Sequence, residues 1–135
     1  MSSNNHISTI INKDIRQIEP SALIREEKKR FPAVIANSLG YKLVANLPYY
    51  ITSPVLRHFL EAPLKPQVMV VMVQKEVAEA IVAEPGQMSV LSVSVQFYGK
   101  PTIVGYVPAR CFYPAPEVDS AILRVALYAK PEVAI

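Results

Sequence analysis

Glycine is scarce in this chain, with only four among 135 residues, at positions 40, 86, 99 and 105. No two of them lie closer than six positions apart, so the sequence contains neither GxGxxG nor GxxxxGK. These are the glycine patterns whose backbone cradles phosphate groups. The chain therefore has no glycine-rich phosphate loop of its own.

Cysteine and long hydrophobic runs are also rare. The single cysteine, Cys111, excludes a disulfide within the chain. The longest uninterrupted apolar run, residues 68–73, is far shorter than the ~20 residues of a membrane-spanning helix. Residues 1–5 are polar and lack the basic-then-apolar pattern of a signal peptide. We therefore expect a cytoplasmic protein with no membrane partner.

The remaining composition is that of a globular domain. Apolar residues make up 51% and charged residues 19% of the chain, and the length suits one domain. Fourteen basic against eleven acidic residues give a net charge of +3. This mildly basic balance permits a nucleic-acid partner without requiring one.

Apolar spacing predicts alternating strands and helices. Strands are expected at 7–11, 41–45, 68–73, 102–107 and 121–128. Helices are expected after Ser21, which could cap the first, after Thr52 or Ser53, and at 75–84. Such alternation predicts an α/β sheet with helices on its faces, and the unbroken apolar run 68–73 predicts a strand covered on both faces. Segment 89–97 fits a strand or a helix equally well.

Ligands of such sheets bind at the carboxyl ends of the strands, where residues 46–50 (Asn-Leu-Pro-Tyr-Tyr) are expected. Pro48 stiffens this turn, and Tyr49 offers an aromatic face beside the Asn46 amide. A flat heterocycle with an exocyclic NH2 group suits this set. Its ring would stack on Tyr49, and the Asn46 side-chain oxygen and the Leu47 carbonyl would accept the two amino hydrogens. The alternative is a structural proline turn with a capping asparagine and a packed tyrosine.

Three segments together resemble the ribosomal RNA adenine dimethyltransferases, the family of the bacterial 16S rRNA dimethyladenosine transferase and the Erm-type methylases. The first is 44–54, Val-Ala-Asn-Leu-Pro-Tyr-Tyr-Ile-Thr-Ser-Pro. The second is 73–79, and the third is 112–121, which is similar to the family signature F-x-P-x-P-x-V-D-S-A. The third favours the small-subunit enzyme over the Erm type. Order and spacing agree from about residue 10 to residue 125.

The resemblance implies an enzyme that transfers methyl groups from S-adenosylmethionine to the N6 amine of adenines in small-subunit ribosomal RNA. It assigns catalysis to Asn46, Leu47, Pro48 and Tyr49, and stacking of the flipped base to Tyr49 and Phe112. It assigns cofactor binding to Asp14, Ile15 and Asn46. It implies no metal. Read alone, Asp14 also suits a simple turn and Phe112 a loop anchor.

The sequence also departs from the family pattern. It lacks the glycine-rich loop after the family's first strand and the acidic residue after its second. The resemblance therefore implies that residues 1–135 form a truncated, partial Rossmann-like class I methyltransferase domain, from the third to the seventh strand. The first two strands of the family order 3-2-1-4-5-7-6 and the C-terminal helical domain would be missing.

Two expectations follow from this departure. The isolated chain should show negligible methylation, since its cofactor site is incomplete. Strand 41–45 should expose an apolar edge, so that the chain either forms a homodimer through that edge or repositions its first strand. Two other functions stay open, namely a non-catalytic RNA-binding or ribosome-assembly remnant and a DNA adenine methylase.

Overall fold

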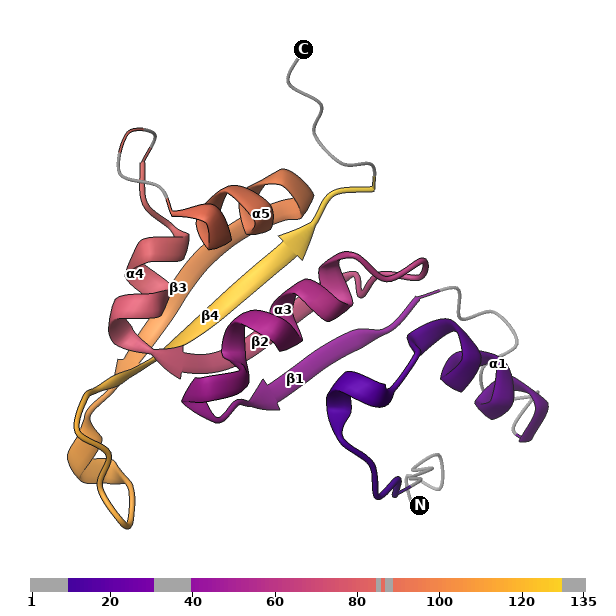
Figure 1. Cartoon of the computed structure of the whole chain (residues 1–135), viewed down its shortest axis with the longest axis horizontal. Helices are drawn as coiled ribbons and strands as arrows, with labels where there is room; N and C mark the ends of the chain where they lie inside the picture. The colour runs from indigo at the N-terminus through magenta and orange to yellow at the C-terminus, as the bar shows by residue number, and fades with distance from the viewer. Residues whose placement is uncertain (1–9, 31–39, 85, 87–88, 130–135) are drawn as a thin grey trace, which may run out of the picture.

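A mixed four-stranded sheet with the order β1-β2-β4-β3 organises the part of the chain that the computed structural model describes, residues 10–30, 40–84, 86 and 89–129 (Figure 1). The strands are β1 (Lys42–Asn46), β2 (Val68–Gln74), β3 (Gly99–Val107) and β4 (Ser120–Leu127). β1 and β2 are parallel, whereas β4 runs antiparallel to both β2 and β3. This order matches the 4-5-7-6 part of the sheet that the resemblance implies.

Helices α3, α4 and α5 lie over one face of the sheet, and α1 lies beyond β1 (Figure 1). Their bounds are α1 Pro20–Arg30, α3 Thr52–Leu60, α4 Lys75–Ile81 and α5 Val90–Tyr98. Three short 3-10 turns complete the described elements, η1 (Ile15–Gln17), η2 (Tyr49–Ile51) and η3 (Ala109–Cys111). The α/β class expected from the sequence is therefore confirmed.

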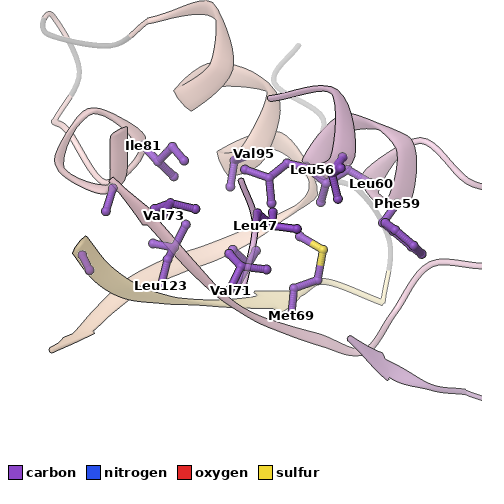
Figure 2. Packing of buried hydrophobic residues seen from close by; sticks show 14 residues of the cluster. Leu47, Leu56, Phe59, Leu60, Met69, Val71, Val73, Ile81, Val95 and Leu123 are labelled. Carbon is purple, nitrogen blue, oxygen red and sulfur yellow. The ribbon is translucent and has the colours of Figure 1, made fainter. Parts of the chain in front are cut away.

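The hydrophobic core lies between these helices and the sheet. Met69, Val71 and Val73 of β2 are almost completely buried, because alternate residues of a strand point to the same face. Figure 2 shows them with Leu47 and Leu123, facing the helical side chains Leu56, Leu60, Ile81 and Val95. Apolar residues at helical spacing on α3 and the alternate, buried residues of β2 build this core.

The prediction that β2 is covered on both faces is wrong for the described residues. Val68, Val70 and Met72 alternate with the buried residues and are only half-buried. On the neighbouring strand β1, Val44 pairs with Val70 and is 78% exposed. An unbroken apolar run indicates that both faces of the strand are apolar. Whether each face is covered depends on tertiary packing.

Segment 89–97 is resolved as a helix. Ser89 caps α5, since its Oγ accepts a hydrogen bond from the Ser92 backbone N–H at 3.2 Å. Burying Ser92 and Val95 against the core selects the helical pattern over the strand pattern.

The caps expected for the first two helices, Ser21 and either Thr52 or Ser53, are wrong. The Glu19 carboxylate, not Ser21, accepts from the first backbone N–H groups of α1, those of Ser21 and Ala22. α3 begins without a side-chain cap because η2 leads directly into it, and Thr52 Oγ1 instead donates to the Pro48 carbonyl at 3.3 Å.

The strand expected at 7–11 falls mostly outside the described residues, and Ile10 and Ile11 lie in no strand. The segment that follows is tied to α3, where the ring nitrogen Nε2 of His58 donates to the Ile18 carbonyl at 2.6 Å. Among the described residues, no helix is long and apolar enough to cross a membrane.

Candidate functional site

The sheet topology brings three distant segments to one edge. The parallel strands β1 and β2 end there at Asn46 and Gln74, and the antiparallel β4 begins there at Ser120. Ser120 also pairs with Val107, the last residue of β3. The connection that follows Asn46 and the loop between β3 and β4 therefore meet at this edge.

A pocket of about 370 Å³ lies between these two connections. This volume falls within the ~300–1,000 Å³ range of small-molecule sites. Its lining residues are Asn46, Leu47, Pro48, Tyr49, Phe112, Tyr113, Pro114, Pro116 and Ser120. The structure thus unites all four predicted catalytic residues with the predicted stacking residue Phe112.

The first wall of the pocket is the segment from Asn46 to Tyr49. Leu47 fixes it, because its side chain is buried in the core and its N–H donates to the Met72 carbonyl at 3.4 Å. Pro48, with φ −58°, then turns the chain into η2. Asn46 stays exposed, and its side-chain amide has no hydrogen-bond partner among the described residues.

Tyr49 is held across the pocket floor. Its hydroxyl lies 2.9 Å from Oγ of Ser120, a residue 71 positions later in the chain. Ser120 is buried, whereas the Tyr49 ring remains half-buried. Tyr49 thus lines the pocket with part of its surface exposed, while its hydroxyl is anchored.

The second wall is the loop between β3 and β4. It begins with η3, whose first residue, Ala109, donates its backbone N–H to Oδ1 of Asp119 at 2.8 Å. Phe112 follows η3 and is half-buried, and Tyr113 beside it is fully exposed. Both of these adjacent aromatic residues line the same pocket as Tyr49.

Comparison with known proteins agrees with this arrangement. The family model described as ribosomal RNA adenine dimethylase matches residues 1–134. The chain belongs to the ribosomal RNA adenine dimethylase family.

Named relatives are ribosomal RNA small subunit methyltransferases A. The protein from Dehalococcoides mccartyi is 52% identical over 126 residues, which are 93% of this chain and 38% of the relative. The protein from Streptococcus pneumoniae is 40% identical over 129 residues, which are 94% of this chain and 42% of the relative. The chain thus spans about two fifths of the length of these relatives.

Two solved structures show the same fold as this dimethylase-family chain. A dimethyladenosine transferase from Plasmodium falciparum superposes with a TM-score of 0.61 at 29% identity, over 80% of this chain and 45% of its own. The 23S rRNA methyltransferase ErmE gives a TM-score of 0.61 at 28% identity, over 84% of this chain and 51% of its own. The class I methyltransferase fold is therefore confirmed.

The cofactor residues predicted for this dimethylase-family chain are not brought into one pocket. Asp14 and Ile15 lie outside the pocket that Asn46 lines, and Ile15 instead borders an apolar hollow with Leu23, Tyr41 and other residues. Both Asp14 carboxylate oxygens accept from Arg16, at 3.0 Å from Nε and 2.7 Å from Nη2. These hydrogen bonds lower the pKa of Asp14 from 3.8 to about 2.

Among the described residues, those that the resemblance assigns to S-adenosylmethionine thus lie apart, with Asn46 and Ile15 lining different pockets. Asp14 is a carboxylate already paired with Arg16, Asn46 is an unpartnered amide, and the sequence has no glycine-rich loop to hold the rest of such a ligand. No group of three or more metal-ligating side chains occurs in the described part of the chain.

Segment 112–121 carries the family resemblance, but of its pocket residues the sequence analysis assigned a role only to Phe112. The pocket residues of this segment without an assigned role are Tyr113, Pro114, Pro116 and Ser120. Ser120 precedes an expected strand, and a hydroxyl at a strand terminus is a weak signal by itself. It became recognisable only when antiparallel pairing placed the start of β4 beside the end of β2.

Proposed function

We propose that this chain supplies the target-base pocket of a ribosomal RNA adenine N6,N6-dimethyltransferase. The observation that supports it is the joining of Asn46–Tyr49 and Phe112 in one pocket. The substrate proposed is an unpaired adenine of small-subunit ribosomal RNA, extruded from its helix, in the cytoplasm.

Each residue has a separate task in this proposal. The adenine ring stacks between Tyr49 and Phe112, as bases do on aromatic side chains. The Asn46 side-chain oxygen and the Leu47 carbonyl accept the two N6 hydrogens. These hydrogen bonds draw the nitrogen lone pair out of conjugation with the ring, so the amine becomes nucleophilic. The same acceptors stabilise the positive charge that develops on nitrogen during attack.

S-adenosylmethionine is the proposed methyl donor, and Asp14, Ile15 and Asn46 are the residues that this chain would offer to it. Because these residues do not share a pocket in the structure, we expect the isolated chain to bind the donor weakly and to methylate negligibly. Titration calorimetry with S-adenosylhomocysteine measures this directly. Micromolar binding would contradict the expectation.

The base pocket itself is tested with short RNA oligonucleotides that carry one unpaired nucleoside, either adenosine or purine riboside, which lacks the N6 amine. We expect the chain to prefer adenosine. Asn46→Ala should remove this preference, whereas Tyr49→Ala should weaken the binding of both oligonucleotides. Asn12→Ala changes an exposed asparagine outside the pocket and serves as the control.

The outcomes of this test separate the remaining alternatives. Equal binding of adenosine and purine riboside by the unmodified chain would contradict the proposal and favour a general RNA-binding module. Tighter binding of duplex DNA than of RNA would instead favour a DNA adenine methylase.

We further propose that two copies of the chain pair through β1. This strand lies at the edge of the described sheet, and Val44 at its centre is 78% exposed. Antiparallel pairing of two β1 strands about Val44 places Lys42 opposite Asn46, so no like charges meet. Among the described strands, none pairs with the outer side of β1, and a free edge of this kind favours pairing with another chain.

A further inference from the structure

Asp119 and Ser120 are adjacent in the chain, yet each contacts a different wall of the pocket. Ser120 Oγ lies 2.9 Å from the Tyr49 hydroxyl in the first wall. Asp119 Oδ1 accepts from the Ala109 N–H at 2.8 Å in the second wall. We infer that these two residues are positioning residues that set the spacing between Tyr49 and Phe112.

Asp119 reaches Phe112 through two consecutive hydrogen bonds. Its carboxylate accepts from the Ala109 N–H, and the Ala109 carbonyl accepts from the Phe112 N–H at 3.1 Å. Ala109 is therefore held from both sides. A displacement of the Asp119 carboxylate would move the turn from which Phe112 projects.

The pair is anchored firmly enough to serve this purpose. Ser120 is buried and pairs with Gln74 of β2 and Val107 of β3, so it lies between two strands. The backbone carbonyl of Asp119 accepts from the Lys75 N–H at 2.9 Å, at the start of α4. The sheet therefore fixes Ser120 and the start of α4 fixes Asp119, while the two pocket walls are connections that would otherwise move independently.

The Asp119 contact is tested by amide hydrogen exchange, which needs no RNA. We expect Asp119→Ala to speed exchange at Ala109 and Phe112 by about tenfold or more, since both amides lose their protection. Asp119→Asn keeps an acceptor oxygen and should restore slow exchange. Glu117→Ala removes a neighbouring exposed carboxylate and is the matched control. Unchanged exchange in Asp119→Ala would overturn this part of the inference.

The Ser120 contact is tested by a double-mutant cycle on the binding of the adenosine oligonucleotide. Tyr49→Phe keeps the ring and removes only the hydroxyl, so it should fold even if Ser120→Ala does not. Each variant should weaken binding by about threefold to tenfold, and the double variant should be no weaker than either. Additive losses would show that the two hydroxyl groups act separately and would overturn the inference. Tyr106→Phe, outside the pocket, is the control.

The inference rests on the proposed function only for the identity of the base. If the unmodified chain binds no RNA, the proposed function fails, and the exchange experiment still decides whether Asp119 holds the loop. In that case the Tyr49 ring signal in a tyrosine-labelled NMR spectrum replaces the affinity measurement. Ser120→Ala should shift that signal, and an unchanged signal would overturn the Ser120 contact.

Discussion

Gln96 of α5 holds the end of α4 at Ile81. Its side-chain amide donates to the Ile81 carbonyl at 2.8 Å and to the Ala83 carbonyl at 3.1 Å. The last carbonyl groups of a helix have no partner within the helix, so this side chain satisfies one of them, that of Ile81, together with the Ala83 carbonyl just beyond the helix. The contact joins the two helices that cover the β3–β4 side of the sheet.

Replacing Gln96 by Leu should therefore destabilise the fold. The change keeps the side-chain size but leaves both carbonyl groups unpaired, and we expect a loss of about 1–3 kcal/mol in the free energy of unfolding. Urea denaturation measures this loss. Gln17→Leu, at an exposed position, should change it little, and equal stability of the two variants would contradict the prediction.

The pairing of Asp14 with Arg16 predicts a pH dependence. Because the pKa of Asp14 is lowered from 3.8 to about 2, its contribution to stability is present above pH 3.8 and is lost as the pH falls through about 2. Arg16→Ala should return the pKa of Asp14 toward 3.8. An NMR titration of the carboxyl carbon follows this change, and Arg57→Ala, which removes the separate contact with Glu61, is the control. A pKa that stays near 2 in Arg16→Ala would contradict the assigned cause.

Phe112 should matter for RNA binding far more than other partly exposed aromatic residues. Phe112→Ala removes one face of the proposed base stack, which is worth about 1–3 kcal/mol for a stacked base. Phe97→Ala on α5, where the ring is 39% exposed outside the pocket, should leave affinity unchanged. Fluorescence anisotropy with the adenosine oligonucleotide compares the two. Equal affinities would remove Phe112 from the proposed site.

The proposed β1 interface predicts that a substitution in β1 changes the oligomeric state of the chain. Val44→Lys places a charge at the centre of the edge strand, and a like charge would then face itself across the two-fold axis. We expect the variant to be monomeric at concentrations where the unmodified chain is dimeric, as measured by analytical ultracentrifugation. Val104→Lys on β3 alters an exposed valine on the opposite edge and should keep the dimer. A monomeric unmodified chain would end the proposal.

The alternation of strands and helices was predictable because apolar spacing is a local property. The helix after residue 52 and strands β2, β3 and β4 follow from it, with ends displaced by a few residues. Local spacing could not separate helix from strand at 89–97, since both patterns place apolar residues inward. Burial of Ser92 and Val95 against the core decided for the helix.

Capping and coverage needed the tertiary structure. Ser21 has the right residue type for a cap, but Glu19 reaches the free N–H groups first. The apolar run of β2 predicted two covered faces, and the described helices α3, α4 and α5 cover only one. Both differences have the same reason. The type of a residue limits the environments that suit it, but the neighbours it contacts are decided by the tertiary structure.

The candidate site divides in the same way. Asn46, Leu47, Pro48, Tyr49 and Phe112 could be named from residue types and the family resemblance, because stacking and hydrogen bonding depend on those types. Strand order decided that these residues share one pocket. It also decided that Ser120 joins the pocket and that Asp14 lies outside it. The antiparallel β4 carries residues 119 and 120 back to the edge where β1 and β2 end. This strand pairing brings the Ser120 hydroxyl to Tyr49, 71 residues away in the chain.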